Sequence, residues 1–266
     1  MKQLLAALMM CSVAVASADD AADSGRAILE KHKAAVVTVQ LVIKTKFGMA
    51  GGDSQNDESK AEATGTVIDP SGLTVVSLTE TDPTSLMESM MSNFGGGGFK
   101  VDTEVRDVKI LLEDGKEIPA EIVLRDKELD MAFVRPAEKS ETVFAFIDLK
   151  DSAPAQLLDQ VISISRLGTV ARRAPAASIE RISAVVDKPR TFYVPGKDPT
   201  STGLGSPAFG LDGKPIGVFL MRAIKDTTGG GGGGFGAMFG AADNVTVVLL
   251  PGADILEGAS QVPPYE

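Results

Sequence analysis

The segment that decides the fold reads Ser201-Thr-Gly-Leu-Gly-Ser-Pro-Ala-Phe-Gly-Leu-Asp-Gly-Lys-Pro-Ile-Gly-Val218. Its first half is a glycine-rich loop that ends at Pro207. Asp212-Gly213 then predicts a short turn, because these two residue types favour tight turns. A strand that contains glycine returns from Pro215. Pro207 and the Asp212-Gly213 turn therefore serve as fixed points when the rest of the sequence is aligned with known sequence patterns.

The composition bounds the function. The chain has 266 residues, a net charge of −10 and one cysteine, Cys11. We expect no nucleic-acid partner, because an acidic surface repels phosphates. With no cysteine after the N-terminal apolar run, neither disulfides nor thiol chemistry are expected. No later apolar stretch has the length of a membrane span. We expect no cofactor and no metal, because the chain has no His/Cys cluster and its loop acids lack calcium-loop spacing.

The N-terminus is typical of a secretory signal. Lys2 precedes an apolar run from Leu4 to Val15, and Ala16-Ser17-Ala18 offers a small-residue cleavage site. We therefore predict residues 1–18 as a signal peptide and the mature protein as periplasmic or extracellular. Polar residues and a proline between Asp148 and Pro154 suggest a boundary between an N-terminal domain, 19–147, and a C-terminal domain with its tail, 148–266.

Short β-branched runs separated by turn residues dominate the remaining chain, which favours antiparallel barrels or a sandwich. A short helix is expected from Gly25 to Lys33, and a polar loop from Gly48 to Glu62. The predicted strands are 36–43, 64–69, 73–77, 108–112, 117–124, 130–135, 160–165, 179–186, 191–194, 215–221 and 245–250. Two glycine-rich segments, Met87 to Phe99 and Gly229 to Gly240, predict mobile hairpin insertions; alternatively, their Met and Phe side chains form a partner-binding lip.

Three blocks and the Leu204 loop resemble proteases of the HtrA/Deg type, a trypsin-like serine protease family. Thr64-Gly-Thr-Val-Ile-Asp-Pro-Ser-Gly-Leu-Thr-Val-Val76 is similar to the family's Gly-Ser-Gly-Phe-Ile-Ile hairpin, which leads to its Thr-Asn-x-His. Val108 to Pro136 is similar to the block with the catalytic aspartate. Leu158 to Ile164 resembles the start of the second barrel. The resemblance implies an all-β, trypsin-like double barrel of two antiparallel six-stranded Greek-key barrels, with a short N-terminal helix.

The resemblance also implies a catalytic triad, which this sequence does not complete. The position of the aspartate is filled by Asp130, that of the histidine falls near Thr79, and that of the serine is Leu204. The family's mechanism needs a serine oxygen, a histidine base and an orienting carboxylate. His32 is expected to be an exposed residue of the N-terminal helix. Backbone donors of Gly203, Leu204 and Gly205 would form an oxyanion hole without a nucleophile beside it.

A buried Asp130 without histidine needs another hydrogen-bond donor. We therefore expect the Thr79 hydroxyl to donate to Asp130; the alternative is that Asp130 is exposed at a barrel end. Ser206 is the fallback nucleophile of an altered triad, although a small-residue packing position suits it better.

These observations predict an exported pseudoprotease, without peptidase activity and without the family's C-terminal PDZ module. It would bind a peptide or protein through the remnant substrate groove, and the sequence does not indicate its oligomeric state. Two alternatives stay open. One is an active serine endopeptidase that uses Ser206, and the other is a structural domain that acts through the Gly/Met/Phe-rich loops.

Overall fold

The computed structural model describes residues 20–49, 55–82, 99–139, 143–196, 203–223 and 245–265. The predicted signal peptide and nearly all of both glycine-rich segments lie outside the described residues. None of the helices described is long and apolar enough to cross a membrane.

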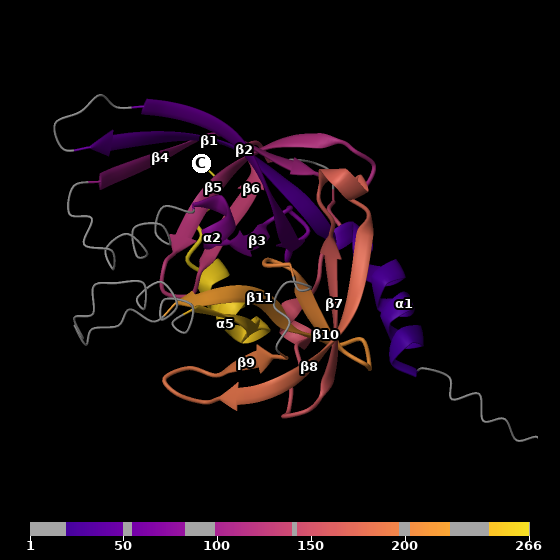
Figure 1. Cartoon of the computed structure of the whole chain (residues 1–266). Helices are drawn as coiled ribbons and strands as arrows, with labels where there is room; N and C mark the ends of the chain where they lie inside the picture. The colour runs from indigo at the N-terminus through magenta and orange to yellow at the C-terminus, as the bar shows by residue number, and fades with distance from the viewer. Residues whose placement is uncertain are drawn as a thin grey trace, which may run out of the picture.

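The first six strands close into a barrel (Figure 1). They are β1 (Val36–Met49), β2 (Gln55–Val67), β3 (Thr74–Ser77), β4 (Phe99–Leu111), β5 (Glu117–Asp126) and β6 (Met131–Pro136), in the order β1-β2-β3-β6-β5-β4. All neighbouring pairs are antiparallel. Alternate residues of β1, Val37, Val39 and Leu41, are buried in its core because successive side chains of a strand point to opposite faces.

The second barrel has the order β10-β11-β12-β9-β8-β7. Its strands are β7 (Gln160–Arg166), β8 (Pro175–Val186), β9 (Phe192–Pro195), β10 (Pro207–Gly210), β11 (Pro215–Ala223) and β12 (Val245–Pro251), all antiparallel to their neighbours. The predicted pair of closed six-stranded antiparallel barrels is therefore confirmed.

The helices lie between and beside the barrels (Figure 1). The short pieces are η1 (Lys33–Ala35), α2 (Leu78–Thr81), η2 (Leu149–Asp151) and η3 (Thr169–Ala171). The predicted N-terminal helix is present as α1 (Asp20–His32) and begins before Gly25; Asp20 and Asp23 in its first turn complement the helix dipole. A helix that the sequence did not predict, α5 (Gly252–Ala259), follows β12.

A single apolar cluster joins the two barrels. It contains Phe133 of β6, Phe209 of β10 and Ile255 of α5, all fully buried. The close fit of α5 depends on Gly258, where an added Cβ would lie 2.8 Å from the Met131 Cε. The barrels therefore pack as one body, and the polar residues at their junction keep fixed positions relative to one another.

The expected loop from Gly48 to Glu62 is wrong. β1 and β2 instead form a long hairpin in which Val36 pairs with Thr66 at one end and Phe47 with Gln55 at the other. β4 extends the same sheet by pairing with β1 as far as Met49. Backbone pairing between β1 and β2 thus continues along Gln55 to Lys60, although this part of the sequence is polar throughout.

Candidate functional site

Asp130 is the centre of the candidate site. It directly precedes β6, has the positive φ of 56° and is 8% exposed. Its Oδ1 accepts hydrogen bonds from the Thr79 backbone N–H (2.8 Å) and from the Thr79 Oγ1 (2.7 Å). Its Oδ2 accepts from the Ser77 Oγ (2.6 Å) and from the Met221 backbone N–H (2.8 Å). The predicted donation by Thr79 is confirmed, and the alternative of an exposed Asp130 is wrong.

These donors satisfy the Asp130 carboxylate without an imidazole. Burial raises the pKa of Asp130, while the hydrogen bonds from Ser77, Thr79 and Met221 act in the opposite direction. Ser77 and Thr79 belong to the first barrel, and Met221 lies on β11 of the second. The aspartate therefore ties the two barrels together.

Glu80 follows Thr79 and was missed by the sequence reasoning. Its side chain is half-buried, and its Oε2 is enclosed with no hydrogen-bond partner among the described residues. Burial, and secondarily the charge of Asp130, raises the pKa of Glu80 to about 8, although the backbone N–H of Thr64 opposes this. The Thr-Asn-x-His pattern could have found it, because matching Ser77 to its threonine puts Glu80 at the histidine position.

The glycine-rich loop contacts the first barrel at Gly205. Its N–H donates to the Phe219 carbonyl of β11 (2.7 Å), and its carbonyl accepts from the Thr66 Oγ1 of β2 (2.7 Å). Its φ is +77°, and an added Cβ would lie 1.9 Å from the Thr64 carbonyl oxygen. Only glycine fits, because both the backbone conformation and the close approach exclude a side chain.

The predicted oxyanion donors are not all free. The N–H of Gly205 is already bonded to Phe219, so at most Gly203 and Leu204 can offer backbone donors to a ligand. Leu204 is half-buried and presents an apolar side chain at the serine position.

Ser206 is fully buried, and its Oγ is enclosed without a partner among the described residues. Its backbone N–H donates to the Gly203 carbonyl at 3.2 Å. A nucleophile must reach a substrate carbonyl. An enclosed hydroxyl does not, so this geometry argues against Ser206 as an alternative nucleophile.

The expectation of an exposed His32 is wrong. The ring is half-buried and stacks on Phe209 of β10, with centroids 4.7 Å apart. Burial, and secondarily the charge of Lys31, lowers the pKa of His32. The hydrogen bonds to Asp130 come from Ser77, Thr79 and Met221, so His32 does not replace the missing base.

Among the residues that the structure describes, no strand pairs with one edge of β11 beyond Val218. The pairing with β10 ends at Val218, whereas the pairing with β12 continues to Ala223. Phe219 and Met221 direct their backbone N–H groups to the side away from β12, toward Ser206 and Asp130. Because backbone groups alternate along a strand, the Met221 carbonyl and the backbone groups of Ala223 also point to this open side.

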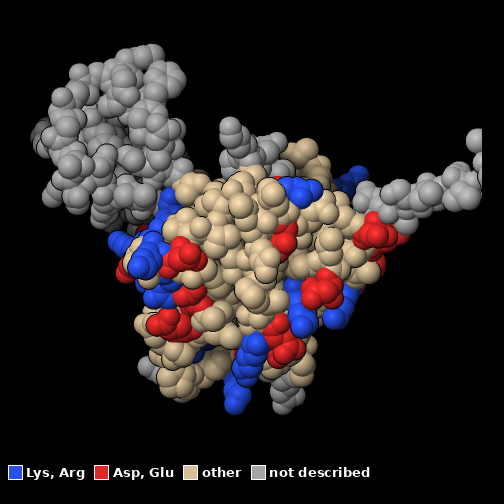
Figure 2. Space-filling view, turned by 90° about the horizontal axis from the view of Figure 1, so that it is seen from below, with Lys and Arg blue, Asp and Glu red and all other residues tan. Residues whose placement is uncertain are grey.

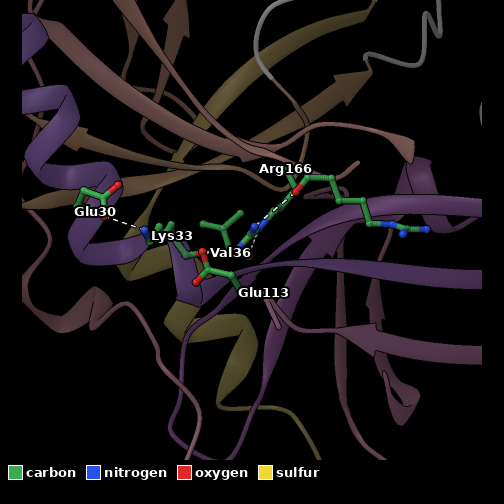
Figure 3. Close-up of polar contacts among 6 residues, drawn as sticks. Glu30, Lys33, Val36, Glu113 and Arg166 are labelled. Carbon is green, nitrogen blue, oxygen red and sulfur yellow. Dashed lines mark hydrogen bonds and ion pairs between the residues drawn. The ribbon is translucent and has the colours of Figure 1, made fainter. Parts of the chain in front are cut away.

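Further cross-barrel contacts lie beside α1. Figure 3 shows Arg166 of β7 reaching the chain where η1 becomes β1. Its Nε donates to the Val36 carbonyl (2.8 Å) and its Nη2 to the Lys33 carbonyl (2.7 Å), while the Glu113 carboxylate is 3.9 Å away. Burial lowers the pKa of Arg166. These bonds fix the start of the first barrel on the second.

On the surface, Figure 2 shows one face with basic and acidic side chains interspersed around a largely uncharged centre. A phosphate backbone is bound by a continuous basic stripe or patch. This face has none.

The comparisons with known proteins agree with this architecture. Residues 63–218, more than half of the chain, match the family model of the trypsin-like peptidase domain. No curated protein matches the chain. The matched range contains β3 and β6, which flank Asp130, and the whole Leu204 loop.

Proposed function

The chain belongs to the trypsin-like peptidase family, and we propose that it is an exported pseudoprotease of the HtrA/Deg type. It binds a peptide or protein segment through the remnant substrate groove, without hydrolysing it.

The observation that carries this proposal is the hydrogen bonding of Asp130. Among the described residues, Ser77, Thr79 and Met221 donate four hydrogen bonds to its carboxylate, so the group that would orient a base is already engaged. Leu204 at the serine position has neither a proton to lose nor a lone pair. Loss of a serine-protease triad typically lowers kcat by about 10⁶-fold, which is about 8 kcal/mol of transition-state stabilisation.

Binding needs none of these groups. The open edge of β11 offers the Met221 carbonyl and the backbone of Ala223 beside the Leu204 loop. An extended peptide can add to such an edge through main-chain hydrogen bonds, and neighbouring side chains then select its sequence. Export rests on the N-terminal signal, and a peptide or protein partner is preferred over nucleic acid because the chain is acidic.

The test uses the mature protein, residues 19–266, and fluorescein-labelled casein. We expect casein binding, measured by fluorescence anisotropy, with no release of labelled fragments and no labelling by a fluorophosphonate probe. Ala223→Pro removes the N–H at the open edge and should weaken binding at least about tenfold. Arg222→Ala is the matched control, because the backbone of Arg222 points to β12.

Two outcomes would replace the proposal. Casein cleavage and fluorophosphonate labelling that disappear in Ser206→Ala would establish the altered serine peptidase. Binding that survives Ala223→Pro but is lost on deletion of residues 229–240 would favour the domain that acts through its Gly/Met/Phe-rich loops.

A further inference from the structure

Glu80 is a carboxyl group enclosed beside a second carboxyl group. Thr79 donates twice to Asp130, and Glu80 is the next residue of α2. The Glu80 Oε2 has no partner among the described residues. β2 contributes the neutral backbone of Thr64, and among the described residues Asp130 is the one charged group that acts on Glu80.

Two ties between the barrels lie close to this pair. One is the hydrogen bond from the Met221 N–H of β11 to the Asp130 Oδ2. The other is the contact of the Leu204 loop with β2, where the Thr66 Oγ1 donates to the Gly205 carbonyl. The backbone of Thr64 contacts both places, because its N–H donates to the Glu80 carboxyl and its carbonyl oxygen lies against Gly205.

We propose that Glu80 is a proton-dependent positioning residue, whose neutral form keeps both ties closed and whose ionised form loosens the groove beside Leu204. The inference rests on the proposed function, since the groove that it regulates is the remnant substrate groove. It assigns no catalytic step to Glu80.

The physical reason is that an ionised Glu80 would be a second negative charge in an enclosed site. Among the described residues no cation pairs with it, so repulsion from Asp130 and the loss of hydration both act against the closed arrangement. Either Glu80 moves toward solvent or Asp130 shifts away, and the second movement breaks its bond to Met221. Because the pKa of Glu80 is raised to about 8, the change is centred in mildly alkaline solution.

Amide hydrogen exchange of the mature protein tests this, with rates corrected for the intrinsic effect of pH. In the wild type, protection of the Met221 amide, whose N–H makes the tie to Asp130, should fall at least about tenfold between about pH 6.5 and about pH 9.5. In Glu80→Gln, which keeps the shape but cannot ionise, protection should not change with pH. Glu128→Gln removes an exposed carboxyl and should behave as the wild type.

A wild type whose protection is independent of pH would overturn the inference, and so would an unchanged transition in Glu80→Gln. Should that variant not fold, carboxyl ¹³C NMR of the wild type decides, because the Glu80 titration must coincide with the exchange transition. Casein binding separates this inference from the proposed function. Absence of binding at every pH refutes the function, whereas binding that does not weaken above about pH 8 refutes only the switch.

Discussion

Gly205→Ala should be among the most destabilising single substitutions in this protein. The Cβ would lie 1.9 Å from the Thr64 carbonyl oxygen, and the φ of +77° already disfavours a side chain. The strained φ costs about 1–2 kcal/mol. Relief of the clash must move the loop away from β2, which sacrifices the bond from Thr66 and weakens that to Phe219, each worth about 1 kcal/mol. The sum is about 3–4 kcal/mol.

Gly115→Ala is the matched control, because Gly115 has a φ of +82° and nothing lies within 4 Å of its added Cβ. It should cost only the strain of about 1–2 kcal/mol. Thermal unfolding of the two variants is expected to show a lowering of Tm of about 10 °C for Gly205→Ala and of about 4 °C for Gly115→Ala. Equal shifts would refute the close contact between the Leu204 loop and the first barrel.

Three further predictions concern the buried polar groups. Asp130→Asn puts an amide NH₂ among hydrogen-bond donors and should lower the free energy of unfolding, measured by guanidinium titration, by about 2–4 kcal/mol. Thr79→Val should lower it by only about 1 kcal/mol. Equal losses would contradict the role of Asp130 as an acceptor shared by several donors. The folded pKa of Glu80 is raised from 4.5 to about 8, so its contribution to stability is full below pH 4.5 and is lost as the pH rises through 8. Glu80→Gln should therefore gain about 3 kcal/mol over the wild type at about pH 9, after discounting for the partial exposure of the side chain, and urea titrations at both ends of this range measure the gain. The folded pKa of His32 is lowered from 6.5, so stability that is present above pH 6.5 is lost as the pH falls. In His32→Gln the midpoint of urea unfolding should therefore fall less steeply with decreasing pH than in the wild type. An unchanged pH dependence would contradict the burial of the His32 ring against Phe209.

Much of the fold could be predicted because its signals are local. Alternating apolar residues and turn residues predicted part of every strand except β10, although β1, β2 and β4 extend six to nine residues beyond the predicted ranges. The Asp212-Gly213 turn lies between the end of β10 and the start of β11, as predicted. β10 was missed as a separate strand because its four residues carry no alternation that can be recognised. The outer part of the β1–β2 hairpin was missed because the sequence from Gln55 to Lys60 is polar throughout and shows no apolar alternation.

The candidate site was predicted in part. Thr79 and Asp130 could be brought together because the order of the blocks fixed both positions. Glu80 was missed because the alignment placed Thr79 at the histidine position, and a shift of one residue places Glu80 there instead. The Met221 N–H could not be predicted at all, because a backbone group has no sequence signature and its contact with Asp130 depends on how the two barrels pack.

The hydrogen bonding of Asp130 gives this residue a role that does not require catalysis. Its carboxylate accepts hydrogen bonds from Ser77 of β3, from Thr79 of α2 and from Met221 of β11, and so links the two barrels. Removing it would leave several buried donors without partners, each at a cost of about 1–3 kcal/mol. An aspartate at this position is therefore explained by the packing of the barrels alone. Its presence is therefore evidence for the fold and not, by itself, for catalysis.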